Sequence, residues 1–454
     1  MESNGIRMSR QSANTQDIAR CPGAGRRATC KNTGKCTLPL LLVAAVAFAG
    51  LAIACTPAQE PLSEMMVRSE IARCPEASYL DGREGTLKWN YTTGLELQAM
   101  LEMAVNKPAS AGRPARDFRD ESRKGFKAAG GSGESYSPVS YVNAWYDAII
   151  SEDGTIGGGY DAAKCNIDHI CPGRTLLNLR KVCPKAKYDK AIENIFAQLQ
   201  GMPRTEAGAF WHKKIYPSQV WLDGLYMAEP FYAQYAAETG RTELFDDIAL
   251  QFKVAWEKTY DPETGLPRHA WDESREMFWC DPETGQSAHS WGRATGWYAM
   301  ALTDVLDFFP ADHPGRQALL DILQQLLNTL PRYADPKTGM WYQVLDAPGR
   351  EGNYVEATCS AMFTYVYLKS ARKGWLPDGT GIIPEQLYKR LVEAFIRTNE
   401  DGTISLVDCC AVAGLGGKQN RSGTYDYYIH ETITENDPKG IGPFIWASLE
   451  YEQL

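Results

Sequence analysis

Hydrophobic side chains recur every three or four residues over most of the chain, which is the spacing of helices with one buried face. The pattern is most regular at 244–256 and 319–330. Similar stretches lie near 91–105, 139–150, 172–182, 188–200, 218–238, 288–309, 355–373, 384–398 and 440–453. The periodicity therefore predicts about eleven helices, with strands contributing little.

One turn sequence recurs between these stretches. Segments 261–265 and 281–285 both read DPETG, and 335–339 reads DPKTG. Proline fixes φ at the second position of such a turn, and glycine supplies a positive φ at its end. Shorter relatives occur at 152–155 and 400–403. A helix, then this turn, then a short aromatic segment is typical of repeated helical hairpins.

About eleven or twelve helices in one domain suit a closed ring of six hairpins, an (α/α)6 barrel, and the fold class is all-α. An open helical solenoid is the alternative, because the hairpin pattern does not separate the two. We expect a single domain over 80–454, preceded by a tether at 55–79. The segment 107–137 is rich in glycine, serine and charged residues, which predicts an exposed loop.

The amino-terminal region has the layout of a targeting segment. Residues 38–54 are apolar and uncharged, and the 37 residues before them carry seven basic against two acidic side chains. This layout predicts a secretory signal over 1–54. The small residues before Cys55 resemble a lipoprotein signal, which implies lipidation of Cys55, export, and membrane attachment through the lipid alone. A transmembrane anchor is the alternative, since about 17 apolar residues lie at the lower limit for a span.

Composition excludes several function classes. The chain has 47 Lys+Arg against 56 Asp+Glu and a net charge of −9, so a nucleic-acid partner is not expected. Twelve cysteines in 454 residues are too few for a disulfide scaffold. Cys165, Cys171 and Cys183 either pair after export or remain as buried thiols.

Common catalytic motifs are missing from the sequence. It contains no His-Glu-x-x-His, Cys-x-x-Cys or Gly-x-Ser-x-Gly, and no phosphate-binding glycine loop, so a metalloprotease, a nucleotide-dependent enzyme and a serine hydrolase all lose support. The glycine-rich segment 413–417, with a tyrosine cluster at 425–428, lacks the helix-opening context of a nucleotide loop. We interpret it as a loop at the mouth of the barrel.

Asp223 is the first candidate for chemistry. It lies in the aromatic segment 211–232, on a helix expected to open near Ser218, with apolar neighbours on both sides. A lone carboxylate in such surroundings should have a raised pKa, as a general acid near neutral pH requires. The alternative is a carboxylate that caps a neighbouring loop.

A second dense segment spans 268–297. It combines tryptophans with basic side chains: Trp271, Trp279, Trp291 and Trp297 with His269, His289 and Arg293. Tryptophan faces suit the apolar side of a sugar ring, and arginine forms a bidentate pair with a carboxylate. The segment therefore predicts a carbohydrate pocket, with a tryptophan-rich core as the alternative.

These motifs resemble one family. The segment YPSQVWLDGLYMA at 216–228 is similar to the signature of the unsaturated rhamnogalacturonyl hydrolases, glycoside hydrolase family 105. The resemblance continues through SWGRATGWY at 290–298, GLG at 414–416 and NDPKGIGPF at 436–444, and covers the chain from about Trp89 onward. It implies an (α/α)6 barrel that removes a 4,5-unsaturated uronyl unit from the non-reducing end of lyase-generated oligosaccharides, unsaturated rhamnogalacturonan disaccharide by default. It implies no metal or cofactor.

The resemblance also implies roles for residues. Asp223 would protonate C4 and then, as a carboxylate, help to deprotonate the water that adds at C5. A second family carboxylate falls on Asp168, which would orient the substrate or raise the pKa of Asp223 as a like charge. The implied sugar subsite contains Asp168, His212, Gln219, Met227, His269, Trp291, Arg293 and Trp297. We assign Arg293 to the uronate carboxylate.

Three other functions remain open at this point. One is an unsaturated glucuronyl hydrolase that acts on another polysaccharide. A second is a conventional inverting glycosidase, whose acid and base would lie roughly 6.5–9.5 Å apart. The third is a non-catalytic sugar-binding lipoprotein, which needs the tryptophans but no buried acid. The polar stretch 107–137 departs from the family pattern, so the early rim of the barrel is expected to differ.

Overall fold

The computed structural model describes residues 60–77, 80, 87–105, 126–127 and 135–454. The expected signal, Cys55 and most of the polar stretch 107–137 lie outside the described residues. Within the described part of the chain, no helix has both the length and the apolar character needed to cross a membrane.

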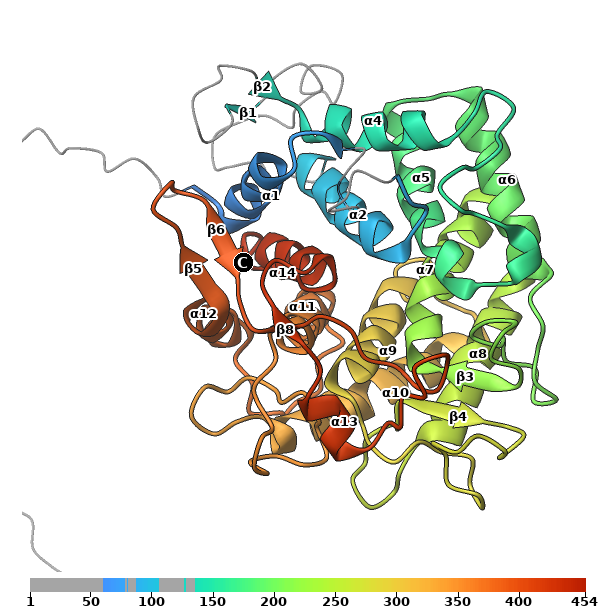
Figure 1. Cartoon of the computed structure of the whole chain (residues 1–454), viewed down its shortest axis with the longest axis vertical. Helices are drawn as coiled ribbons and strands as arrows, with labels where there is room; N and C mark the ends of the chain where they lie inside the picture. The colour runs from blue at the N-terminus through green and yellow to red at the C-terminus, as the bar shows by residue number, and fades with distance from the viewer. Residues whose placement is uncertain (1–59, 78–79, 81–86, 106–125, 128–134) are drawn as a thin grey trace, which may run out of the picture. The chain divides into compact units, whose positions relative to one another are not determined.

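Six helices form a closed inner ring (Figure 1). They are α2 (Tyr91–Val105), α5 (Cys171–Val182), α7 (Leu222–Thr239), α9 (Gly292–Val305), α11 (Ala357–Lys373) and α14 (Pro438–Tyr451). Each contacts the next in this order, and α14 contacts α2. The predicted all-α barrel is confirmed, because an open solenoid would leave the first and last of these helices apart.

Six outer helices surround this ring. They are α1 (Leu62–Arg73), α4 (Pro138–Ile149), α6 (Ala186–Gln200), α8 (Leu244–Thr259), α10 (Pro314–Thr329) and α12 (Pro384–Phe395). The outer helices α4, α6, α8, α10 and α12 each pack on the inner helix that precedes them in the chain, and α1 packs on α14. The sixth hairpin is thus assembled from both ends of the domain, which completes the (α/α)6 arrangement.

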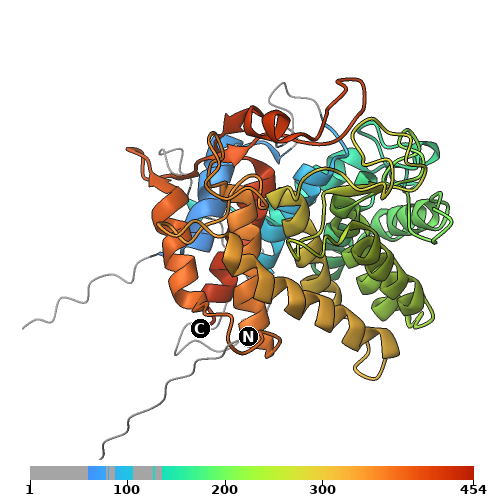
Figure 2. The same ribbon diagram turned by 90° about the horizontal axis from the view of Figure 1, so that it is seen from below.

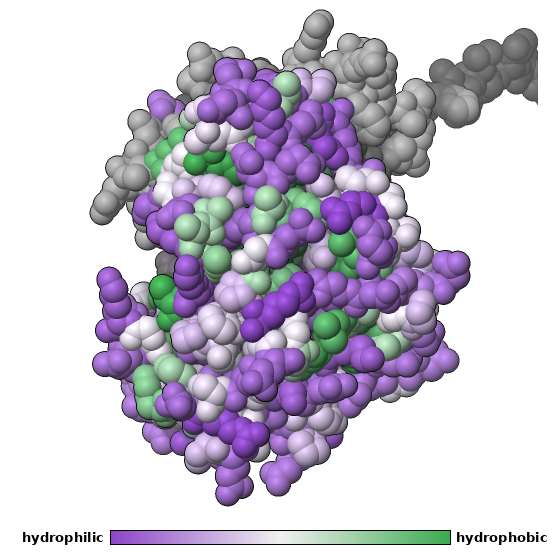
Figure 3. All heavy atoms as spheres, turned by 90° about the vertical axis from the view of Figure 1, so that its right-hand side faces the viewer, coloured by the Kyte–Doolittle hydropathy of each residue, from purple (hydrophilic) through white to green (hydrophobic). Residues whose placement is uncertain are grey.

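Burial separates the two rings. Every residue of α9 is buried, whereas α12 buries only Leu387, Tyr388, Leu391 and Phe395. A helix that is apolar on one stripe packs at a surface, and one that is buried all round lies inside. Figure 3 accordingly shows mostly hydrophilic side chains on the face it presents, with hydrophobic ones in small scattered groups.

All eleven predicted helices are present, but α1 is an addition. It lies within 55–79, which the sequence predicts to be a tether, so the folded domain begins at Leu62 and not near residue 80. Its buried face includes Ser63, Ser69 and Glu70, which dilute the apolar pattern. Hydrogen bonds hold it instead: Ser63 binds the Glu452 carboxylate, and Ser69 accepts from the Ile404 amide.

Strands are short and antiparallel. The pairs are β1 (Phe126–Lys127) with β2 (Ser135–Tyr136), β3 (Gln219–Trp221) with β4 (Ala270–Asp272), β5 (Ile396–Thr398) with β6 (Ile404–Leu406), and β7 (Cys409–Cys410) with β8 (Ile433–Thr434). A short helix, α13 (Tyr425–Ile429), was not predicted. The expected helix opening near Ser218 is wrong: Ser218 has a left-handed φ of 62°, β3 follows it, and α7 begins at Leu222.

The recurring turns adopt the predicted conformation. Gly265, Gly285 and Gly339 have φ values of 75°, 79° and 73°. In each turn the aspartate side chain accepts hydrogen bonds from the threonine three residues later, through both its amide and its hydroxyl. The turn at 281–285 differs in context, because it lies between β4 and α9 and follows no helix.

The six inner helices run in the same direction, because an outer helix returns the chain before each new one. Their amino-terminal ends therefore meet at one end of the barrel, where α13 lies, and their carboxyl-terminal ends meet at the other, near the carboxyl terminus of the chain (Figure 2). Aligned peptide dipoles give the first end a partial positive charge and the second a partial negative charge.

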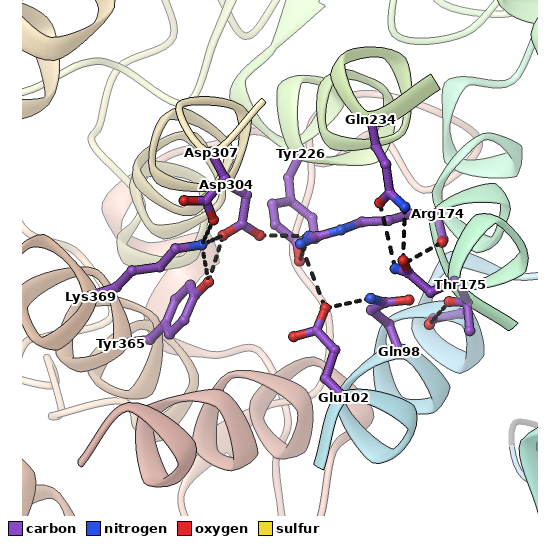
Figure 4. A network of polar contacts seen from close by, with 12 residues as sticks. Gln98, Glu102, Arg174, Thr175, Tyr226, Gln234, Asp304, Asp307, Tyr365 and Lys369 are labelled. Carbon is purple, nitrogen blue, oxygen red and sulfur yellow. Dashed lines mark hydrogen bonds and ion pairs between the residues drawn. The ribbon is translucent and has the colours of Figure 1, made fainter. Parts of the chain in front are cut away.

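The second end contains a cavity of about 680 Å³ and a buried polar network (Figure 4). Asp304 lies at its centre and accepts from Arg174 at 2.5 Å, Lys369 at 2.7 Å and Tyr365 at 2.5 Å. Burial raises the pKa of Asp304, but the charges of Arg174 and Lys369 outweigh it and bring the pKa to about 2. These cations also offset the negative ends of the inner helices.

Replacing Asp304 tests this network. We expect Asp304→Asn to lower the free energy of unfolding by about 3 kcal/mol, because Arg174 and Lys369 lose their buried carboxylate partner. Asp307→Asn is the matched control: its carboxylate is 27% exposed against 1% for Asp304, and it should cost about 1 kcal/mol. Urea unfolding at pH 7 measures both.

The pH dependence has a defined sign. Because folding lowers the pKa of Asp304 to about 2, its stabilisation is complete above the unfolded value of about 3.9 and is lost as pH falls toward 2. Equal destabilisation by the two variants, or an Asp304 effect that persists unchanged at pH 2, would contradict the assignment.

Candidate active site

The β3–β4 pair brings Asp223 and His269 together. Trp221 lies opposite Ala270, and the Leu222 amide continues the pairing by donating to the His269 carbonyl at 3.1 Å. Asp223, in the first turn of α7, therefore faces the residue just before β4. Its Oδ2 lies 3.2 Å from His269 Nε2. The result is a carboxylate–imidazole pair at the amino-terminal end of the inner ring.

The pKa of Asp223 is lowered, so the expectation of a raised pKa is wrong for the free protein. Burial does raise it, but the contact with His269 and the electrostatic effects of His269, His212 and Arg293 outweigh burial. His269 and Arg293 come from another segment of the chain, and the apolar neighbours of Asp223 in the sequence gave no sign of their contact with it. Asp223 is thus ionised at neutral pH in this state.

A third buried group completes the pair. The Tyr428 hydroxyl, on α13, lies 2.7 Å from His269 Nδ1. The Trp291 ring packs against both, with centroids 4.9 Å from His269 and 6.0 Å from Tyr428. Tyr428 was not predicted as a site residue, although it belongs to the tyrosine cluster that the sequence placed at the barrel mouth.

His212 lies on the other side of Asp223. Its amide donates to the Gln219 carbonyl at 2.8 Å, and its ring is parallel to that of Trp221, 4.5 Å away. Burial is the main cause that lowers the pKa of His212 to about 4, so it is neutral at pH 7. Gly224 permits this approach, because a Cβ there would lie 3.2 Å from His212 Nδ1.

Gln219 supports the stacked rings of His212 and Trp221. Its Oε1 accepts from the Trp221 indole N–H at 3.1 Å, and the side chain is buried. Gln219 therefore holds Trp221 against His212. The structure places this predicted subsite residue beside the site, in contact with a ring that lines it.

Asp168 is paired with Lys213 at 2.6 Å and lies 3.7 Å from His212. Burial raises the pKa of Asp168, but the charge and hydrogen bond of Lys213, together with the nearby His212, outweigh it and lower the pKa overall. The expected like-charge effect of Asp168 on Asp223 is not found, because Lys213 compensates its charge. Asp168 instead positions His212 and Lys213 at the edge of the site.

Arg293 brings a buried positive charge to the first turn of α9. Its side chain is 1% exposed, it donates to the Cys410 carbonyl, and its guanidinium lies 4.5 Å from the Trp291 ring centroid. Burial lowers its pKa, but Cys410, Glu356 and Asp437 raise it more, so Arg293 remains charged. Glu356 and Asp437, the N-caps of α11 and α14, were not predicted.

Trp297 and Tyr91 extend the site toward α2. The Trp297 ring packs on Tyr226 at 4.9 Å and on Tyr91 at 6.4 Å. Burial raises the pKa of Tyr91; Arg293 opposes this, while Asp168, Asp223 and Asp437 add to it. The Tyr91 phenol thus lies among the charged groups of the site. It opens α2 without a distinctive local motif, and the sequence gave no signal for it.

Met227 lies away from these groups. It is one helical turn beyond Asp223, 2% exposed, and lines a small internal void with Tyr226 and Trp446. Trp271, Trp279, Trp291 and Trp297 are likewise buried, so most of their surface is core. Among the predicted residues, His269, His212 and Arg293 act directly on Asp223. Asp168 contacts His212, and Trp291 contacts His269 and Arg293. Gln219 and Trp297 reach the site through Trp221 and Tyr91.

The described residues include eight cysteines and several potential metal ligands. The eight described cysteines, including Cys165, Cys171 and Cys183, are free. Over the same residues, no group of three or more His, Cys, Asp or Glu side chains is arranged to hold a metal ion.

Comparisons with known proteins agree with this geometry. The Glycosyl Hydrolase Family 88 model matches residues 62–454, beginning at α1. A family 105 glycoside hydrolase of C. acetobutylicum ATCC 824 is 40% identical, with a TM-score of 0.77, over 87% of this chain and all of that one.

Two curated proteins are also similar. The 24.9 kDa protein in picA locus of Rhizobium radiobacter is 38% identical over 49% of this chain and 97% of its own length. Unsaturated rhamnogalacturonyl hydrolase YesR of Bacillus subtilis (strain 168) is 27% identical over 64% of this chain and 77% of its own length. The chain is therefore a glycoside hydrolase: it belongs to the family described by the Glycosyl Hydrolase Family 88 model and to glycoside hydrolase family 105.

Proposed function

We propose that this hydrolase removes the 4,5-unsaturated uronyl residue from the non-reducing end of lyase-generated oligosaccharides, and that unsaturated rhamnogalacturonan disaccharide is its substrate. The observation that carries the proposal is the Asp223–His269 pair beside the buried Arg293. Similarity to YesR, an unsaturated rhamnogalacturonyl hydrolase, supports rhamnose as the leaving sugar.

The electrostatics of this end of the barrel suit an anionic sugar. The chain as a whole is acidic, at −9, and does not attract a uronate from a distance. Locally, the amino-terminal ends of six inner helices and the Arg293 guanidinium supply positive potential. The uronate carboxylate is therefore assigned to the Arg293 side, which places the C4=C5 bond toward Asp223.

The reaction is a hydration of the vinyl ether. Asp223 gives a proton to C4, which leaves positive charge shared between C5 and the ring oxygen. Water then adds at C5, and the Asp223 carboxylate takes its proton. The resulting hemiketal opens by breaking the bond between C5 and the ring oxygen, and the exposed hemiacetal at C1 releases the rest of the oligosaccharide. One water is consumed, and Asp223 ends as it began.

Asp223 must be protonated for the first step, yet its pKa is lowered in the free protein. Binding resolves this conflict, because the substrate adds a negative charge and displaces water from a buried carboxylate, and both effects raise its pKa. The proton is then taken up together with the substrate.

Loss of absorbance from the conjugated C4=C5 uronate measures the reaction directly. We expect the protein from residue 56 onward to consume unsaturated rhamnogalacturonan disaccharide, and Asp223→Asn to lower kcat about 10³-fold, because it removes the proton donor. Asp426→Asn, with a side chain 86% exposed on α13, is the matched control and should keep full activity.

Isotope labelling separates the mechanisms. In D₂O, hydration places one deuterium at C4, and in H₂¹⁸O it places the label at C5. A conventional inverting glycosidase would place ¹⁸O at C1 and would act on saturated substrates. If the absorbance does not fall, the unsaturated products of pectin, glycosaminoglycan and ulvan lyases are tested next as substrates. Binding of these without turnover would overturn the proposal in favour of a sugar-binding protein.

Proton uptake tests the role of binding. A saturated galacturonate–rhamnose disaccharide carries the same carboxylate and is not turned over. At pH 7 its binding should take up close to one proton, read from the dependence of binding enthalpy on the ionisation enthalpy of the buffer. Uptake should vanish in Asp223→Asn and should decrease as pH falls toward the lowered pKa of free Asp223. Equal uptake by both proteins would assign the proton to another group.

We also propose that the enzyme is exported and held at a membrane by a lipid on Cys55. The support is the basic stretch and apolar run that precede Cys55. Labelled palmitate should be incorporated by the wild type and not by Cys55→Ala, and this variant should leave the membrane fraction. Retention of the variant in the membrane would indicate an uncleaved transmembrane anchor instead.

A further inference from the structure

The buried row Tyr428–His269–Asp223 is not explained by the proton transfer described above. The Tyr428 hydroxyl and His269 Nδ1 are 2.7 Å apart, and His269 Nε2 and Asp223 Oδ2 are 3.2 Å apart. Tyr428 and His269 are fully buried. Among the described residues, the Tyr428 hydroxyl has His269 as its hydrogen-bond partner and no other.

The positions of the hydrogens follow from what each atom can do. Neutral histidine carries one N–H, and a phenol carries one O–H. A proton on Nδ1 would point the Nε2 lone pair at the ionised Asp223 and would leave the Tyr428 hydrogen buried without an acceptor, which is costly. A proton on Nε2 lets Tyr428 donate to Nδ1 and turns an N–H, not a lone pair, toward the Asp223 carboxylate. Nε2 and Oδ2 are 3.2 Å apart, an ion-pair contact that is not aligned as a hydrogen bond in this structure.

The same arrangement distinguishes the two oxygens of Asp223. Oδ2 is buried, while the Asp223 side chain as a whole is 17% exposed, so its accessible part lies away from His269. An oxygen that faces an N–H acts as an acceptor and does not itself hold the acidic proton. This leaves Oδ1, on the accessible side of the carboxylate, as the oxygen available to the proton that substrate binding adds.

We propose that Tyr428 is a positioning residue: through its hydroxyl it fixes the Nε2–H tautomer of His269, and this directs the reactive proton of Asp223 to Oδ1. Removing the hydroxyl leaves Nδ1 without a donor, and the tautomer is then set by Asp223 alone. The His269 Nε2–H then stabilises the ionised form of Asp223 less, and the two carboxylate oxygens differ less in their tendency to hold the proton.

Other charges near this row are accounted for. Asp223 is also faced by His212 and Arg293, both of which lower its pKa. Burial raises the pKa of Tyr428 well above its usual range; Tyr427, Asp223 and Asp346 add to this, and Arg421 opposes it. Tyr428 is consequently a neutral phenol throughout the working pH range, and its O–H is always present to donate.

The test variant is Tyr428→Phe, which keeps the ring that packs on Trp291. In wild-type protein labelled with ¹⁵N-histidine, His269 should show the Nε2–H tautomer, and Tyr428→Phe should show a mixture with Nδ1–H. The chain has six histidines, so His269→Gln assigns the signal. Tyr427→Phe is the matched control: its hydroxyl accepts from the Gly414 amide at 3.1 Å, and the tautomer should not change.

Kinetics supply the second readout, and this part rests on the proposed function. The alkaline limb of kcat reports Asp223 in the bound state. In Tyr428→Phe the midpoint of this limb should move upward by about 0.5 pH unit, because the ionised form of Asp223 has lost part of its support from His269. The variant should have a kcat about tenfold lower and a KM that is little changed. Tyr427→Phe should superimpose on the wild type.

The outcomes are separable. His269 carrying its proton on Nδ1 in the wild type overturns the proposal, even if Tyr428→Phe does not fold. An unchanged tautomer and pH limb in a folded Tyr428→Phe also overturns it. Because the tautomer is observed without turnover, a protein inactive on every unsaturated uronide would refute the proposed function and still leave the role of Tyr428 decided by the spectra.

Discussion

Closure of the inner ring is the constraint on which the rest of the structure depends. The six inner helices are buried over most of their surface. Their apolar side chains are all covered only if the last helix packs against the first, as α14 does against α2. Because an outer helix returns the chain each time, the six inner helices of the closed ring are also parallel. The ring therefore has two electrically opposite ends.

The site is built from residues at the amino-terminal, positive ends of the inner helices. Tyr91, Asp223 and Arg293 occupy first turns of inner helices, and Glu356 and Asp437 are N-caps of two more. Residues hundreds of positions apart thereby share one small volume. The opposite end holds Asp304 among Arg174 and Lys369, where cations belong, so the two buried polar clusters of the barrel have complementary roles.

Periodicity predicted the eleven most regular helices, because amphipathic and buried stripes are local properties of the sequence. It missed α1, whose inward face is diluted by Ser63, Ser69 and Glu70. The family signature located Asp223, but the direction of its pKa could not be predicted. That direction depends on His269, which reaches Asp223 through the β3–β4 pairing, and no local pattern encodes this contact.

The pairing of α1 with α14 has a consequence for how the domain is made. Gly442 of α14 lies against Leu95 of α2, and Ser63 binds Glu452, so the final seam joins segments nearly the whole domain apart in sequence. Closure of the ring therefore depends on contacts of high sequence separation, which form late in folding because their loop-closure entropy is large. The same neighbouring ends make the barrel a natural candidate for circular permutation, since a short linker across this seam leaves every hairpin intact.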